Sequence, residues 1–322
     1  MISGTEEGER MSKPKVYIDG QAGTTGLQIY ERLQGREDID LLTIDPDKRK
    51  DERARRECLN EADLAILCLP DEAAQEAVGM IANDRTRVID ASTAHRTAEG
   101  WVYGLPELWR QREKLRTAKR VANPGCYATG VIALVRPLVG AGFLGADYPL
   151  AVHALSGYTG GGNKAIGQYE AETRPAELSS PRHYALGLSH KHIPEIMAQT
   201  GLHRKPIFCP IICDFPRGMA VSVPLALSWM GGVDQKLLRK CYERYYQGEK
   251  LVTIAPETAP EDGFLGSNNF AGRDDLEIVL CGSGDQAVVF ARFDNLGKGA
   301  SGAAVQNMNI MLGFEETKGL NL

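Results

Sequence analysis

Short apolar runs alternate with segments of helical periodicity along roughly the first 125 residues, and this alternation restricts the possible folds more than any other feature. The run Ala62–Leu69 is nearly all apolar, as expected for a strand buried on both faces of a parallel sheet. Other β-rich runs stand at Lys15–Asp19, Ile39–Ile44 and Arg87–Ala91, with helical patterns between them. Strands that alternate with helices predict an α/β fold with a doubly wound parallel sheet of the Rossmann type.

The pattern changes after residue 125. The strand-like runs there are Ala151–Leu155, Ile207–Cys213, Val221–Met230, Glu277–Cys281 and Val288–Asp294. Helices fall between them without regular alternation, which predicts a second α+β domain with a mixed sheet. We therefore expect a disordered lead over 1–12, a dinucleotide-binding domain over 13–125 and a catalytic domain over 126–297. A C-terminal helix within 298–322 begins with small residues and is expected to pack back on the first domain.

The composition excludes several classes of protein. The chain has 322 residues, of which 43% are hydrophobic and 25% charged, the mix of a globular protein. Its net charge of −5 argues against a general nucleic-acid surface, and no apolar run reaches the roughly 18 residues of a membrane span. The seven cysteines form neither a disulfide-like cluster nor a set of metal ligands, so we expect a cytoplasmic protein without a metal site.

A glycine-rich loop separates the first predicted strand from the first predicted helix. Backbone N–H groups at such a helix start can hold a pyrophosphate. The residues expected to contact a dinucleotide there are Gly20, Ala22, Gly23, Thr24, Thr25 and Gly26. The spacing is G-x-x-G-x-x-G rather than the usual G-x-G-x-x-G, so a plain strand-helix turn with spare glycines is the alternative.

The end of the second predicted strand carries conflicting signals about the cofactor. Asp45 stands where an acidic residue usually binds the ribose hydroxyl of NAD. Lys48 and Arg49 follow at once, and both could bind the additional phosphate of NADP. The alternative is that 47–56 forms a solvated helix face of mixed charge.

Cys126 is the candidate nucleophile. It follows a Pro-Gly turn and opens an apolar run with helical spacing, so it should lie in the first turn of a helix. The free N–H groups and the macrodipole at that position favour a thiolate, the nucleophilic form of cysteine. The alternative is a small buried cysteine that fills a gap in the core.

Two residue pairs could serve such a nucleophile. His190 and His192 stand before a predicted helix, and an imidazole can move a proton near neutral pH. Arg96 and Arg217 follow predicted strand ends, where guanidinium groups could bind phosphate or carboxylate. Surface or capping histidines and ordinary ion pairs are the alternatives.

Six motifs stand in order along the chain. They are Gly20–Gly26, Asn123–Thr129, Ser156–Gly160, His190–Glu195, Pro216–Met219 and Asn295–Ala300. Together they resemble the N-acetyl-γ-glutamyl-phosphate reductase family of arginine biosynthesis, in the shorter of its two branches, from roughly Lys13 to Leu322. That family is similar to aspartate-semialdehyde and glyceraldehyde-phosphate dehydrogenases, which implies a homo-oligomer, a dimer or a tetramer, assembled through the catalytic domain.

The resemblance implies an NADPH-dependent reductive dephosphorylation of N-acetyl-L-glutamyl 5-phosphate to N-acetyl-L-glutamate 5-semialdehyde. Cys126 would attack the acyl carbon, inorganic phosphate would leave, and hydride from NADPH would reduce the thioester while His190 or His192 moves a proton. The substrate would contact Arg96, Asn123, Ser156, Gly157 and Arg217. NADP would contact the glycine loop, Lys48, Arg49, Ser92, Asn295 and Gly299.

Three other functions fit parts of the sequence. Aspartate-semialdehyde dehydrogenase would perform the same chemistry on a smaller acyl phosphate. A cysteine hydrolase or acyltransferase would have no hydride step and would bind no nicotinamide. A non-catalytic dinucleotide sensor would bind the cofactor without needing Cys126.

Overall fold

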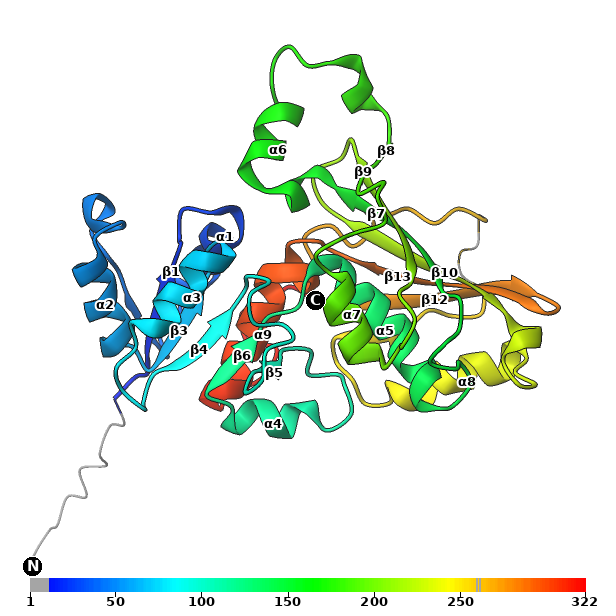
Figure 1. Cartoon of the computed structure of the whole chain (residues 1–322), viewed down its shortest axis with the longest axis horizontal. Helices are drawn as coiled ribbons and strands as arrows, with labels where there is room; N and C mark the ends of the chain where they lie inside the picture. The colour runs from blue at the N-terminus through cyan, green and yellow to red at the C-terminus, as the bar shows by residue number, and fades with distance from the viewer. Residues whose placement is uncertain (1–11, 259, 261) are drawn as a thin grey trace, which may run out of the picture.

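The computed structural model describes residues 12–258, 260 and 262–322, and it builds them around two β-sheets (Figure 1). The expected disordered lead over 1–12 lies almost wholly outside these residues. The first sheet has six parallel strands and the second has seven strands of mixed direction. The prediction of a Rossmann-type sheet followed by an α+β domain with a mixed sheet is therefore confirmed.

The first sheet has the strand order β2-β1-β3-β4-β6-β5. Its strands are β1 (Lys15–Asp19), β2 (Asp40–Leu42), β3 (Leu64–Leu67), β4 (Arg87–Asp90), β5 (Val102–Tyr103) and β6 (Arg120–Ala122). Its helices are α1 (Thr24–Leu33), α2 (Glu52–Glu61), α3 (Asp71–Gly79) and α4 (Gln111–Thr117). The order reverses at β1, and in doubly wound sheets ligands bind beyond the carboxyl ends of the strands at such a reversal.

The second sheet has the strand order β11-β12-β13-β10-β7-β9-β8. Its strands are β7 (Ala151–Gly157), β8 (Arg182–His183), β9 (Ile207–Cys213), β10 (Met219–Ala226), β11 (Val252–Ile254), β12 (Leu276–Ser283) and β13 (Gln286–Phe293). The helices of this half are α5 (Cys126–Gly140), α6 (Gly162–Tyr169), α7 (Ile193–Thr200) and α8 (Gln235–Tyr245). The segment with α6 and β8 projects from the sheet on the side of α1 (Figure 1).

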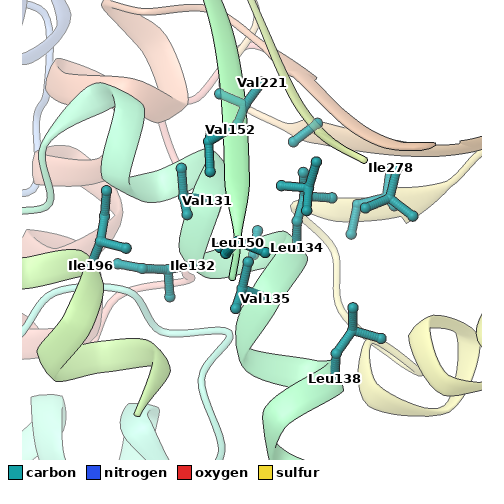
Figure 2. Close-up of a cluster of buried hydrophobic side chains, with 14 of the residues drawn as sticks. Val131, Ile132, Leu134, Val135, Leu138, Leu150, Val152, Ile196, Val221 and Ile278 are labelled. Carbon is teal, nitrogen blue, oxygen red and sulfur yellow. The ribbon is translucent and has the colours of Figure 1, made fainter. Parts of the chain in front are cut away.

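Helix α5 forms the centre of the larger hydrophobic core. Its side chains at Val131, Leu134, Val135 and Leu138 are fully buried and pack with residues of the mixed sheet and of α7 (Figure 2). Gly130 lets this helix approach β10, because a Cβ there would lie 2.6 Å from a methyl group of Val221. Burial on nearly all sides fixes the position of the first turn of α5, which carries Cys126.

The chain returns to the first sheet at its C-terminal end. A π-helical turn, η5 (Gly297–Ser301), leads into α9 (Gly302–Leu312), which packs against α4 and α1. Lys298 in this turn is fully buried, and its Nζ lies 2.6 Å from Oε1 of Glu107 and 2.7 Å from Oε1 of Gln306. Burial alone would raise the pKa of Glu107, but Lys298 and Gln306 outweigh it and the pKa is lowered. A buried ion pair thus fixes η5 against the segment that precedes α4.

We expect Lys298→Met to lower the free energy of unfolding by about 3–5 kcal/mol, because it leaves Glu107 buried without a cation. The matched control is Lys250→Met, whose partner Glu315 is on the surface, with the two side chains 64% and 52% exposed. That control should cost less than about 1 kcal/mol. Chemical denaturation, monitored by circular dichroism, measures the free energy of unfolding of both variants. Equal losses of this free energy would contradict the stabilising role assigned to the buried pair of Lys298 and Glu107.

Candidate active site

Cys126 is the first residue of α5 and lies where the two halves of the molecule meet. Gly125 is the N-cap and contributes no side-chain hydrogen bond, so the N–H groups of the first turn stay free for a ligand. Gly299 of η5 packs against the cysteine, and a Cβ on Gly299 would lie 3.0 Å from the Cβ of Cys126. The predicted helix-start position of Cys126 is confirmed.

A buried carboxylate organises the start of this helix. Glu195 of α7 accepts hydrogen bonds from Nη1 of Arg96 at 2.7 Å and from the Tyr103 hydroxyl at 2.6 Å. It also accepts a bond from the N–H of Gly125 at 3.1 Å. Arg96 and Tyr103 belong to the first half and Glu195 to the second, so this carboxylate joins both halves directly behind Cys126. Sequence reasoning assigned Glu195 no role, although it ends the histidine motif.

The two histidines lie beside this carboxylate. A Cβ on Gly125 would come within 2.5 Å of Nε2 of His192, so that ring lies directly against the residue before Cys126. Nδ1 of His190 accepts the N–H of His192 at 3.2 Å, which places the proton of a neutral His190 on Nε2. The structure therefore places His192 against the residue before Cys126 and His190 against His192, with ring centroids 4.7 Å apart.

Both imidazoles are neutral near pH 7. Burial lowers the pKa of His190 to about 4, and Lys191 and Arg96 add to this effect. Burial also lowers the pKa of His192 well below its ordinary value, again with help from Arg96. Nδ1 of His192 is buried and has no hydrogen-bond partner among the described residues. Each ring can therefore accept a proton that the thiol releases.

Burial opposes the thiolate that the helix-start position of Cys126 favours. Desolvation raises the pKa of the thiol above its ordinary value, and Glu195 adds to the rise. Arg96, the N–H of Tyr127 and Lys191 act in the opposite direction but do not overcome desolvation. The helix terminus is thus too weak to ionise a sulfur so enclosed, and deprotonation requires an acceptor such as an adjacent imidazole.

A cavity of about 470 Å³ is lined by Tyr127, the residue that follows Cys126, although Cys126 itself does not line it. Its lining residues are Tyr127, Ser156, Gly157, Gly160, Gly161, Arg182, His183, Tyr184, His190, Lys191 and Ile212. Ser156 and Gly157, both predicted to contact substrate, are among them. We define these eleven residues as the acyl pocket.

The other three predicted substrate residues make protein contacts. Arg96 is held by Glu195 and by the carbonyl of Asn123, to which its Nε donates at 3.0 Å. The side chain of Asn123 donates to the carbonyl of Ala300 at 3.0 Å. Arg217 lines a different pocket. The residues that line this pocket are Gln28, Glu31, Arg32, Arg217, Gly319, Leu320 and Asn321. The Nε of Arg217 lies 2.8 Å from Oδ2 of the fully buried Asp294, without the alignment of a hydrogen bond.

The glycine loop lies at the carboxyl edge of the parallel sheet and lines two cavities. One cavity is bordered by Tyr17, Ile18, Asp19, Gly20, Gln21, Ala22, Ile44, Arg49, Lys50, Arg55, Leu69 and Ala73. The other is bordered by Gly23, Thr24, Thr25, Gly26, Cys68, Leu69, Ala91, Gly162 and Asn163. Helix α1 has no side-chain cap, so its first N–H groups are free to bind an anion. The residues present therefore fit a dinucleotide.

The loop that follows β2 supplies the cations of this site. Arg49 and Lys50 line the first cavity, whereas the predicted Lys48 does not line it. Asp45 caps the short helix η1 (Pro46–Lys48), because its Oδ1 accepts the N–H of Asp47 at 3.0 Å.

Two other predicted cofactor residues are engaged within the protein. The Ser92 hydroxyl donates to the buried Asp90 at 2.7 Å. The side chain of Asn295 donates to the Thr159 hydroxyl and accepts the N–H of Gly218, each at 2.9 Å. Asn295 therefore ties the start of η5 to the wall of the acyl pocket.

The acyl pocket and the glycine loop are linked directly. Thr24 Oγ1 donates to Oδ1 of Asn163 at 2.7 Å, and Asn163 follows Gly160 and Gly161 of the acyl pocket by a few residues.

Across residues 12–258, 260 and 262–322, no helix is long and apolar enough to span a membrane. Within the same residues, no group of acidic, histidine or cysteine side chains could hold a metal ion.

Comparisons with known proteins agree with this geometry. The model of the semialdehyde dehydrogenase NAD-binding domain matches residues 15–118, and that of the semialdehyde dehydrogenase dimerisation domain matches 126–295. Aspartate semialdehyde dehydrogenase II from Vibrio cholerae has a similar fold, with a TM-score of 0.71 over 94% of this chain and 99% of that one. At 15% identity, this likeness concerns the fold alone.

Curated relatives are much closer in sequence. N-acetyl-gamma-glutamyl-phosphate reductase 2 of Pseudomonas putida is 49% identical over 96% of this chain and its own full length. The reductase of the same name from a Nostoc species is 47% identical with the same coverage. The N-acetyl-gamma-glutamyl-phosphate reductase of Brucella anthropi is 47% identical over 94% of this chain and 99% of its own length. The resemblance found in the six motifs is thus confirmed. The chain belongs to the N-acetyl-γ-glutamyl-phosphate reductase family, within the semialdehyde dehydrogenases.

Proposed function

We propose that this protein catalyses the NADPH-dependent reductive dephosphorylation of N-acetyl-L-glutamyl 5-phosphate to N-acetyl-L-glutamate 5-semialdehyde. The observation that carries the proposal is the position of the Cys126 helix start against the neutral imidazole of His192, with His190 beside it. Tyr127, the next residue, lines the acyl pocket, and a hydrogen bond from Thr24 to Asn163 connects the neighbouring loop to the glycine loop. Curated relatives of this name, nearly full length and almost half identical, support the same reaction.

The first half of the reaction is an acyl transfer to Cys126. His192, whose Nε2 lies against the start of α5, accepts the thiol proton while the sulfur attacks the acyl carbon. The free N–H groups at the start of α5 stabilise the oxyanion of the tetrahedral intermediate. The proton then passes to the departing phosphate, which leaves as hydrogen phosphate, and a thioester remains on Cys126.

The second half converts the thioester into the aldehyde. A bound NADPH supplies the hydride for this reduction. The same N–H donors hold the resulting oxyanion, and His190 offers its Nε2–H from the wall of the acyl pocket as a further donor. The oxyanion then collapses, the carbon–sulfur bond breaks, and the released thiolate takes up a proton from solvent through the imidazole of His192, which is the one proton that the overall reduction consumes.

NADP is the cofactor that the loop after β2 favours. Arg49 and Lys50 line the cavity beside the glycine loop, and the carboxylate of Asp45 is occupied by the cap of η1. Two cations and an occupied carboxylate suit the phosphate of NADP better than the free ribose hydroxyl of NAD.

A homo-oligomer would use the outer face of the mixed sheet. Along β10, Val221, Val223 and Leu225 are buried toward the α5 core, whereas the alternate positions Ser222 and Pro224 are half-buried or exposed. On β9 of the same sheet, Ile207 is 53% exposed. An open sheet face with apolar positions is a typical protein interface.

All seven cysteines are free, which fits a cytoplasmic enzyme.

Aspartate-semialdehyde dehydrogenase is the rival supported by the fold neighbours. Comparing the two semialdehydes at equal concentration, with NADP and phosphate, separates them. The proposal requires a clear preference for N-acetylglutamate semialdehyde, and a preference for aspartate semialdehyde would overturn it. If neither aldehyde reduces the cofactor, the remaining candidates are a cysteine acyltransferase or hydrolase and a dinucleotide sensor.

The variant Cys126→Ala should abolish phosphate-dependent oxidation of N-acetylglutamate semialdehyde, because no other group can carry the acyl chain. The dissociation constant of NADPH, measured by the quenching of protein fluorescence, should stay within about twofold of that of the unmodified enzyme. Cys281→Ala, at a half-buried cysteine of β12, is the matched control and should retain activity. Turnover by Cys126→Ala would refute the assignment of Cys126 as the nucleophile.

The pKa directions predict how Cys126 reacts in the enzyme without substrates. The thiol pKa is raised and the histidine pKa values are lowered, so thiol and imidazole are both neutral at pH 7. Alkylation by iodoacetamide should be slow there and its rate should still be rising beyond about pH 9. A rate that levels off below about pH 7 would reveal a thiolate–imidazolium pair and contradict the neutral assignment.

Cofactor preference can be tested at Arg49. We expect Arg49→Ala to weaken NADPH binding about tenfold and NADH binding much less, because only the former loses a charged hydrogen-bond donor. Arg53→Ala is the matched control in the same segment, since its guanidinium is 88% exposed and already paired with Glu57. Titration of both cofactors measures this, and tighter binding of NADH than NADPH by the unmodified enzyme would contradict the choice of NADP.

A further inference from the structure

One buried carboxylate closes the loop that follows β4. Asp90 is the last residue of this strand and is fully buried. Its Oδ1 accepts the N–H of Ser92 at 2.9 Å, and its Oδ2 accepts the Ser92 hydroxyl at 2.7 Å. The same Oδ2 lies 2.6 Å from Nδ1 of His95. The loop Ala91–Arg96 therefore folds back on the end of its own strand.

His95 is held on its other side as well. Its ring stacks on Trp101, with the centroids 4.0 Å apart and an angle of 13° between the planes. An ionised carboxylate only accepts hydrogen bonds, so Nδ1 of His95 is the donor to Asp90. Within residues 12–258, 260 and 262–322, no lysine or arginine lies within ion-pair distance of Asp90. The burial of this carboxylate therefore depends on the donors of the loop.

The loop ends at Arg96, whose guanidinium reaches the start of α5. Its Nη2 donates to the carbonyl of Ala91, within the same loop, at 3.2 Å, and its Nη1 donates to Glu195 at 2.7 Å. A Cβ on Gly125 would lie 2.5 Å from Nη1 of Arg96, so the guanidinium lies against the residue before Cys126. The position of this cation thus depends on the conformation of the loop.

Asp90 itself does not face the cavities of the candidate active site. It lines neither the acyl pocket nor the two cavities beside the glycine loop. All the hydrogen bonds of its side chain go to Ser92 and His95. Any effect of this carboxylate on the reaction must therefore pass through the loop.

We propose that Asp90 is a positioning residue of the reaction. Its carboxylate holds the loop Ala91–Arg96 so that Arg96 binds Glu195 and lies against the start of α5. The inference rests on the proposed function and adds a residue that acts on the site without touching the substrate. Arg96 is the counter-charge of the buried Glu195, so its displacement would leave that carboxylate without a cation beside Gly125.

Two substitutions of Asp90 test this role. Asp90→Ala removes all three hydrogen bonds and should lower kcat/KM for N-acetylglutamate semialdehyde about 30- to 100-fold. Asp90→Asn keeps one acceptor oxygen and should lower kcat/KM about three- to tenfold.

The matched control is Thr86→Val, just before β4 and thus at the opposite end of the same strand. The Thr86 residue is also buried, and its hydroxyl donates to the carbonyl of Ala62 at 2.8 Å. This control should lower the free energy of unfolding but keep kcat/KM within about twofold. An unchanged kcat/KM in both Asp90 variants, or an equal loss of kcat/KM in the control, would overturn the role of Asp90.

A double-mutant cycle tests the route through Arg96. Arg96→Lys keeps the positive charge but cannot make the three hydrogen bonds of the guanidinium. If Asp90 acts by placing this guanidinium, Asp90→Asn should cost less than about twofold in kcat/KM in the Arg96→Lys background. The same loss in both backgrounds would overturn the route through Arg96.

Alkylation of Cys126 gives a readout that does not depend on the proposed reaction. Arg96 is one of the charges that lower the pKa of this thiol, so its displacement should slow the reaction with iodoacetamide. At about pH 8, Asp90→Asn should be alkylated about threefold more slowly than the unmodified enzyme, and Thr86→Val at an unchanged rate.

Mass spectrometry of the peptide that contains Cys126 measures this rate. If neither semialdehyde is a substrate while the rate responds to Asp90→Asn, the proposed function fails and the positioning role stands. A rate that does not respond to Asp90→Asn would overturn the positioning role itself.

Discussion

The three hydrogen bonds of Glu195 are the interaction on which the active site depends. One fully buried carboxylate holds the guanidinium of Arg96, the hydroxyl of Tyr103 and the N–H of Gly125. The donors precede residue 126 and Glu195 lies on α7 of the second half, so the carboxylate fixes the first turn of α5 relative to the parallel sheet. Removing it would leave Arg96 buried without a counter-charge, which costs several kcal/mol in comparable sites. The location of Cys126 therefore depends on electrostatics as much as on the apolar core behind it.

The same burial determines the chemistry of the resting site. Desolvation raises the pKa of the Cys126 thiol and lowers the pKa of His190 and His192, so the two kinds of group face each other uncharged. A neutral thiol is protected from oxidation and from stray electrophiles. An anionic substrate that binds nearby brings negative charge toward the imidazoles and makes them better proton acceptors. Reactivity would then arise when the acyl phosphate is bound rather than before.

Much of the fold could be predicted because it depends on local pattern. The all-apolar run around β3 and the alternation of strands and helices identified the parallel sheet, and the Pro-Gly turn located Cys126 at a helix start. The two-residue strand β5 gave no signal, because it is too short to show a period. Glu107 precedes α4, and its buried pair with Lys298 joins residues 191 positions apart, which no local pattern indicates.

The site was harder to predict because its roles depend on partners from distant segments. Arg96 is a candidate anion binder in the sequence, but in the fold its guanidinium is already held by the carboxylate of Glu195. Lys48 and Lys50 differ by two positions on one loop, and the turn of η1 decides that Lys50 faces the cavity. The role of Glu195 could not be seen at all, since its three donors lie 70 to 99 residues away in the chain.

The most direct test of the account is a single turnover without phosphate. The enzyme is mixed with NADP and N-acetylglutamate semialdehyde, and the formation of NADPH is monitored by its absorbance. The mass of the peptide that contains Cys126 is then measured by mass spectrometry. The account predicts a burst of one NADPH per active site and an N-acetylglutamyl group on Cys126 that disappears when phosphate is added. An unmodified Cys126 and no burst, in an enzyme that turns over once phosphate is present, would contradict it.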